Sequence, residues 1–159
     1  MKLPLATVLL LAAWPGTVLA MDENIGVQPG ILKWGPPPPG LPPGARVAVV
    51  SGDPSSDGPY VVRAKLPTGY KIPPHTHPTD ENVTILSGTF HIAMGDKFDI
   101  KKGETLKTGG FFNAQKGMVH YGWTTSPTLI QIHGMGPLVI NYVNPADDPR
   151  NAAKTSEKK

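Results

Sequence analysis

Short runs of alternating apolar and polar residues fill the chain between residues 46 and 145, and turn-forming residues separate them. In residues 60–66, Val62, Ala64 and Leu66 share one face of an extended segment. This spacing predicts a strand that turns one face to the core and the other to water. In residues 128–133, Gln131 and His133 alternate with two isoleucines, and the alternation leaves open which face looks inward.

The same pattern recurs often enough to predict a fold class. Further strands are expected at residues 46–50, 71–77, 83–86, 89–94, 98–100, 111–123 and 138–143. Glycine- and proline-containing turns separate them, and no segment has a convincing helical period. Such a density of short strands favours an all-β sandwich or closed barrel over α/β layers.

The two ends of the chain differ from this middle part. Residues 1–20 have a basic start at Lys2, a ten-residue apolar run and a small-residue cleavage site, which predicts a secretory signal peptide. The alternative is an uncleaved membrane anchor. The mature protein would begin at Met21 and be exported, to the periplasm or the medium. No later apolar run is long enough to cross a membrane.

Residues 21–45 form a proline-rich N-terminal arm, with four consecutive prolines at 36–39. Such a segment is extended rather than helical. One interpretation makes it a ligand for a proline-binding module. The favoured one is an arm that packs on its own barrel or on a partner subunit through Ile31, Leu32 and Trp34. Residues 46–145 would then form the barrel, and residues 146–159 a disordered C-terminal tail.

Composition narrows the choice of partners and ligands. Removing the first 20 of the 159 residues takes away Lys2, which leaves fourteen basic and twelve acidic side chains in one domain-sized chain. These charges are scattered, so no nucleic-acid-binding face is expected. The chain has no cysteine, which excludes disulfide bonds and thiolate metal ligands.

Three potential metal ligands lie within seven residues. His75 and His77 alternate on a segment that Pro73 and Pro74 keep extended, so both imidazoles point to one side. Glu81 follows four residues later with the same parity. Two imidazoles and one carboxylate that converge in this way are a typical site for a divalent transition metal.

Two spaced patterns resemble the sequence motifs of the cupin superfamily. The first consists of Gly69, His75, His77, Glu81 and Gly88, and it matches at every spaced position. The second consists of Gly109, Gln115, Gly117, His120 and Thr124, where Gln115 and Thr124 replace the proline and asparagine usual in the family. The resemblance covers roughly residues 30–146. Segments 41–54, 120–123 and 142–145 are similar to a single-domain, ChrR-like cupin subgroup.

The resemblance implies a small antiparallel jelly-roll β-barrel in which His120 is the fourth metal ligand. The segment 111–123 is expected to carry His120 into the sheet opposite the first motif, since a barrel brings distant residues to one interior point. The alternative is a hydrogen-bonded polar cluster without metal. Nitrogen-rich, thiolate-free ligands suit one divalent ion of iron, manganese, nickel, copper or zinc.

Four other side chains are candidates for a pocket beside the metal. Gln131 and His133 could face it, or lie outward on an exposed face. Met118 could approach a soft metal, although a methionine that fills a gap in the core is more common. Phe112 could line an apolar mouth or belong to the core.

Two functions compete on this evidence. The first is a metal-dependent oxidoreductase, of the dioxygenase kind, that acts on a small oxygen-rich molecule, with Glu81 as metal ligand and catalytic base. The second is a non-catalytic module that binds a metal or a small ligand. A homodimer is expected by analogy with the family, because exposed strand edges need covering.

Overall fold

The structure, a computed structural model, describes residues 26–151 and consists there of ten strands and two short 3-10 helices. The strands form two five-stranded antiparallel sheets. The first sheet contains, in spatial order, β1 (Arg46–Ser51), β2 (Gly58–Leu66), β9 (Thr128–Gly136), β4 (Glu81–Ser87) and β7 (Phe111–Ala114). The second contains β10 (Asn141–Tyr142), β3 (Lys71–Thr76), β8 (His120–Thr124), β5 (Thr89–Met94) and β6 (Glu104–Lys107).

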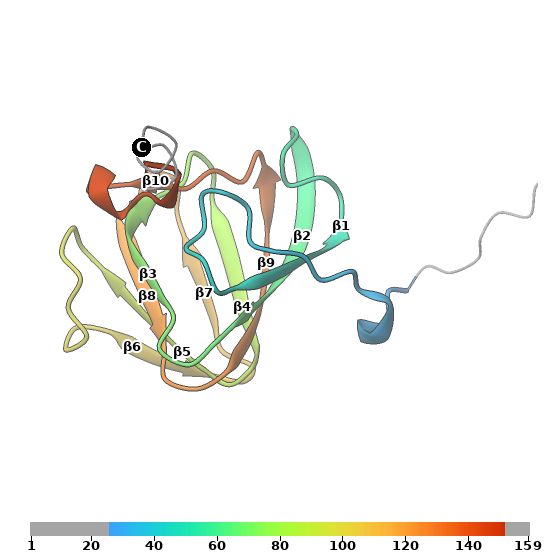
Figure 1. Ribbon diagram of the computed structural model, residues 1–159, viewed down its shortest axis with the longest axis horizontal. Coiled ribbons are helices and arrows are strands. Elements are labelled where there is room, and N and C mark those ends of the chain that lie inside the picture. The colour runs from blue at the N-terminus through green and yellow to red at the C-terminus, as the bar shows by residue number, and fades with distance from the viewer. Residues whose placement is uncertain (1–25, 152–159) are drawn as a thin grey trace, which may run out of the picture.

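The two sheets face each other as a jelly-roll sandwich (Figure 1). The predicted all-β, antiparallel jelly roll is therefore confirmed. Among the strands of residues 26–151, hydrogen-bonded pairing stays within each sheet, so the sandwich is not closed into a continuous barrel. The predicted signal peptide, residues 1–20, lies outside the described residues. No helix within the described part of the chain combines the length and apolar character needed to span a bilayer.

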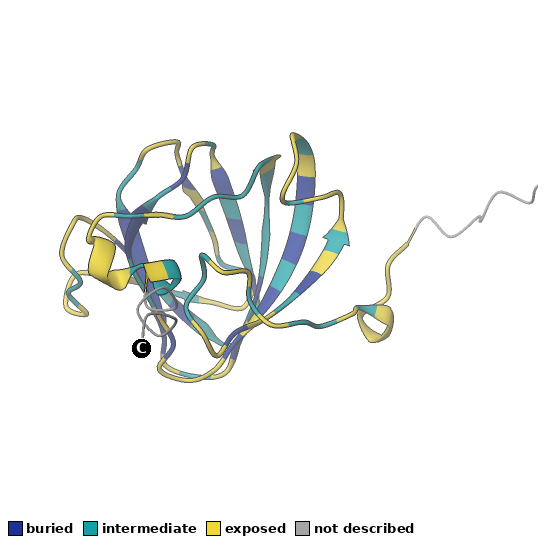
Figure 2. Ribbon diagram, turned by 45° about the horizontal axis from the view of Figure 1, so that its top comes forward, coloured by how far each residue is buried: buried dark blue, intermediate teal, exposed yellow. Residues whose placement is uncertain are grey.

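The space between the sheets holds the main core. On β2, Val62, Ala64 and Leu66 are buried while their neighbours are more exposed, as the alternation predicts (Figure 2). Val83 and Ile85 of β4 lie on the same face of this sheet, and Phe90 of β5, in the second sheet, belongs to the same buried cluster. Apolar side chains that alternate along facing strands thus hold the two sheets together.

A second, smaller core lies on the outer face of the second sheet. Tyr121 and Trp123 point outward from β8 and are buried there with Ala93, and the half-buried Phe98 packs against them. The ring of Phe98 lies 5.0 Å from that of Tyr121. Phe98 therefore anchors a covering loop, and the strand predicted at residues 98–100 is wrong. The sheet gains β6 instead, whose mostly exposed side chains gave no strand signal.

The N-terminal arm packs back on the sandwich from residue 34 onward. Gly35 pairs with Val47 of β1, and the Lys65 ammonium lies 4.1 Å from the centre of the Trp34 ring. By contrast, Ile31, in the 3-10 helix η1 (Pro29–Ile31), is 67% exposed and does not act as an anchor. Figure 1 shows η1 lying apart from the sheets. The first five residues of the arm, 21–25, lie outside the described residues.

The C-terminal segment is also tied to the body. Arg150 donates to both carboxylate oxygens of Asp148 and to the carbonyl of Ile140. A second 3-10 helix, η2 (Pro145–Asp147), precedes these contacts. The structure thus differs from the predicted disordered tail in placing residues 146–151, because Arg150 fixes them. The rest of that tail, residues 152–159, falls outside the described residues.

Candidate metal centre

A bulge in β3 brings His75 to the inner face. Ile72 pairs with Gly122 of β8, whereas His75 pairs with His120, so β3 contains one more residue than β8 between these pairs. The extra residue falls at Pro73–Pro74, and prolines, which cannot donate to a ladder, are tolerated at bulges. Ile72 and His75 are three residues apart and would point to opposite faces of a regular strand. Because of the bulge, both face the space between the sheets.

His120 comes from the same sheet as His75, which corrects the prediction that it would come from the opposite one. Residues 111–114 do join the first sheet as β7, but the chain crosses over before β8 begins. It is Glu81, the first residue of β4, that reaches the cluster from the opposite sheet. A metal held by all four side chains would therefore link the two sheets.

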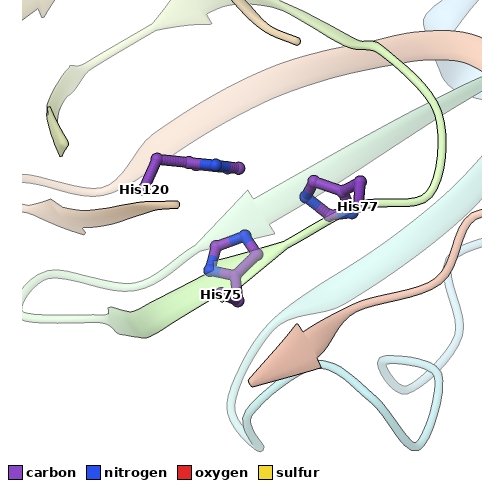
Figure 3. Close-up of side chains that lie close together, drawn as sticks. All are labelled: His75, His77 and His120. Atoms are coloured by element: carbon purple, nitrogen blue, oxygen red, sulfur yellow. The ribbon is translucent and has the colours of Figure 1, made fainter. Parts of the chain in front are cut away.

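The four side chains meet in the interior. His75, His77 and His120 are 3–4% exposed and Glu81 is 8% exposed. One ligand nitrogen from each imidazole can be chosen so that all three lie within 4.8 Å of one another (Figure 3). Glu81 Oε2 lies 3.5 Å from His77 Nε2 and 3.6 Å from His120 Nε2. Bonds of about 2.1 Å to a common ion place ligand atoms about 3 to 3.5 Å apart, so the two separations from the Glu81 oxygen suit a metal.

Backbone carbonyls fix the tautomer of each ring. The Nδ1 of His75 donates to the Pro73 carbonyl at 2.7 Å, that of His77 to Val139 at 2.7 Å, and that of His120 to Met118 at 3.1 Å. A carbonyl only accepts, so each Nδ1 bears hydrogen and each neutral ring keeps a lone pair on Nε2. Buried His77 Nε2 has no hydrogen-bond partner. Three oriented lone pairs, one of them unsatisfied, fit a metal better than a self-contained polar cluster.

The charges in the cluster favour a cation as well. Burial raises the pKa of Glu81, but the neighbouring His120 and His77 outweigh it and hold that pKa below its usual value, so the carboxylate stays ionised. Burial lowers the pKa of His77, and the Glu81 carboxylate more than reverses this. Burial, reinforced by His120 and His77, lowers the pKa of His75 to about 3. His75 is therefore a neutral ligand at any physiological pH.

A cavity of about 270 Å³ extends from the cluster between the sheets. All four cluster residues line it, and so does Phe112. Gln131, His133 and Met118 do not. Gln131 accepts a hydrogen bond from Arg63 on the outer face of the first sheet, and His133 shares that face because Ile130 and Ile132 take the inner one. Met118 lies before β8, where its carbonyl rather than its sulfur serves the site by holding His120.

Two features of the site escape sequence reasoning. Val139, which holds His77 through its carbonyl, is 62 residues away in sequence, and no pattern in the chain signals the contact. Arg150 and the prolines of the arm line the mouth of the cavity, although their composition suggested a surface arm and a tail. The carbonyls of Pro73 and Met118, in contrast, each lie two residues before the histidine they hold.

The structure is similar to several solved proteins. The polyketide cyclase RemF from Streptomyces resistomycificus matches with a TM-score of 0.63 and 16% identity, over 81% of this chain and 92% of its own. A candidate acetylacetone dioxygenase from Methylibium petroleiphilum matches with a TM-score of 0.59 and 18% identity, over 82% and 88%. An RmlC-like cupin from Shewanella frigidimarina matches with a TM-score of 0.54 and 12% identity, over 69% and 87%. No protein-family model matches the sequence, and no curated protein matches it.

Proposed function

Starting from the cupin fold of this chain, we propose that it binds one divalent transition metal and acts on a small molecule in the adjoining cavity. The observation that carries the proposal is the convergence of His75, His77 and His120 at the end of that cavity, with the ionised carboxylate of Glu81 beside them. A buried cluster with an unpartnered imidazole nitrogen has little use in a protein that binds no cation.

Each residue has a distinct part in this proposal. The three imidazoles would offer Nε2 lone pairs, and Pro73, Val139 and Met118 keep them aimed inward through their carbonyls. Glu81 would supply the negative charge. A carboxylate whose pKa is held low is a weak base, so the ligand role of Glu81 comes before the catalytic one.

We propose that the activity is that of a metal-dependent oxidoreductase of the dioxygenase kind. When bound, iron or manganese would supply redox and Lewis-acid chemistry at the end of the cavity. Two observations support this proposal: the ligand set lacks thiolate, and the metal end opens into a cavity that can hold a substrate. The similarly folded Methylibium protein, described as a candidate dioxygenase, is a precedent for this chemistry on the fold.

The number of ligands favours a second candidate, a non-catalytic metal- or ligand-binding module. Four protein ligands can complete the tetrahedral shell of zinc and leave no position for substrate. The test is elemental analysis of the protein isolated from the cells that make it, followed by exchange against a chelator. Iron or manganese with an exchangeable position would support the enzyme, whereas stoichiometric zinc that resists exchange would support the binding module.

Export of the protein is a separate proposal, based on the signal-peptide pattern of residues 1–20. Mass spectrometry of the mature protein should find an N-terminus at Met21. Retention of Met1 in the purified protein would refute this cleavage. The expected homodimer remains a prediction, which sedimentation of the mature protein would test.

A further inference from the structure

The cavity wall identifies the class of substrate. Building on the metal site proposed above, we infer that the substrate is a small, mostly apolar molecule with an uncharged tail and one metal-binding oxygen head. It is not the oxygen-rich molecule expected from sequence. The head would lie at the histidines, and the tail would extend between the sheets.

Apolar side chains from both sheets form the wall beyond the metal end. Val62 and Ile132 of the first sheet and Ile72 and Ile92 of the second line its middle. The strand register places Ile132 next to the metal cluster. Ile132 pairs with Val83, which lies two residues along β4 from Glu81, whose own partner is Gly134. Phe112 lies in the same row as Ile132, because both pair with Val83, and its ring stacks 5.8 Å from that of Phe90, which lies one step beyond Ile92 on β5. A tail placed here would touch hydrocarbon on every side.

The polar side chains that line the cavity are those of the four cluster residues and of Arg150. The Nδ1 atoms of the three histidines are bonded to carbonyls, which leaves only the metal-facing nitrogens. Arg150 at the mouth is bonded to both oxygens of Asp148 and to the Ile140 carbonyl. Its charge is thus balanced, and the cavity does not require an anionic tail. A hydroxyl in the middle of the chamber would lose its hydrogen bonds to water, which weakens binding on the order of tenfold for each group.

Size sets a second limit. The cavity holds about 270 Å³, and a liquid water takes up about 30 Å³, so it has room for about nine non-hydrogen atoms. Segment 38–41 of the arm closes one side. The Tyr142 hydroxyl donates to the Gly40 carbonyl at 2.9 Å and keeps this segment in place. Longer tails would have to displace it.

Straight-chain hydroxamic acids test the inference without relying on turnover. The manganese-loaded full-length protein is titrated by calorimetry with acetohydroxamic, butanohydroxamic, hexanohydroxamic and octanohydroxamic acids, because manganese keeps coordination positions open beyond four protein ligands. Affinity should rise roughly fourfold per methylene, which corresponds to about 0.8 kcal/mol. It should level off near hexanohydroxamic acid, which has nine non-hydrogen atoms. Gluconohydroxamic acid, with the same head and a polyhydroxyl tail, should bind no better than acetohydroxamic acid.

Variants locate the tail in the cavity. Ala64→Leu fills part of the wall from β2 and should make the affinity level off at a shorter chain. Val62→Ile, one methylene larger, is a milder version for use if the first variant does not fold. Val61→Leu is the matched control on the same strand, because residue 61 does not line the cavity. It should leave the series unchanged.

The outcomes separate the two proposals. If the protein takes up no metal, the proposed function fails, and the inference fails with it. If metal binds but affinity is independent of chain length, or gluconohydroxamic acid binds as well as hexanohydroxamic acid, only the inference fails. An unchanged series in both filling variants would also overturn it.

Discussion

Loss of His120 should remove the response of the protein to metal. At metal concentrations 100-fold above the dissociation constant, binding stabilises the fold by about 2.7 kcal/mol. For a domain of this size that corresponds to a rise of roughly 10 °C in Tm. Replacing a partner outside the ligand shell typically costs 10–100-fold in metal affinity, and loss of a direct ligand should cost at least as much as the upper value. In His120→Ala the same metal concentration should then add about 0.4 kcal/mol, or 1–2 °C.

The assay is a set of thermal melts, one with chelator and one with each of the five candidate metals, on the wild type, His120→Ala and His91→Ala. His91→Ala is the matched control. His91 lies on the outer face of the same sheet, stacked on Trp123 and bonded to two threonine hydroxyls. It should retain the full metal-dependent shift. A His120→Ala protein that still gains roughly 10 °C with metal would refute the four-ligand site, as would a wild type that gains nothing from any of the five ions.

Three further predictions follow from the structure. Gly122→Ala would place a methyl group within 2.9 Å of Phe90 Cε1, so it should destabilise the fold by about 1–3 kcal/mol in urea unfolding. Gly30→Ala, where nothing lies within 4 Å, should stay within about 0.5 kcal/mol, and equal costs would contradict the packing argument. The pKa of Asp53 is lowered from 3.8 to about 2 by hydrogen bonds from Ser55 and Ser56, so its contribution to stability is present above pH 3.8 and lost as the pH falls through about 2. An NMR titration should give that midpoint, and one near 3.8 would show that the turn bonds are absent in solution. Metal affinity should fall as the pH falls, because protons compete for the imidazole Nε2 atoms; competition titrations at pH 5 and pH 8 that agree would count against imidazole ligation.

Strand alternation and motif spacing predicted the buried face of β2 and the clustering of the histidines. Val62, Ala64 and Leu66 are buried as their period of two requires, and His75, His77 and His120 do lie together. Parity, however, says only which residues share a face. It does not say to which sheet a strand belongs, and so the sheet of His120 was predicted wrongly.

The surroundings of the site depend on contacts that leave no local pattern. The Val139 carbonyl reaches His77 across 62 residues. The apolar wall of the cavity is made by residues whose spacing was already explained by an ordinary core, such as Ile72 and Ile92. Sequence reasoning about the ligands therefore favoured an oxygen-rich substrate, whereas the residues that would surround most of the substrate point to an apolar one.

The arm at residues 38–41 and the segment 142–150 meet at the cavity, where Tyr142 holds Gly40 and Arg150 lies against it. Boundaries drawn around the strands alone, at residues 46–145, would thus cut away part of the enclosure while sparing both sheets. A protein made of residues 46–145 alone would keep the strands of both sheets and the four metal ligands. Its cavity, however, would be open to bulk solvent on the side that residues 38–41 cover. Any expression plan or tag placement for this protein should treat residues 38–41 and 150 as belonging to the working molecule.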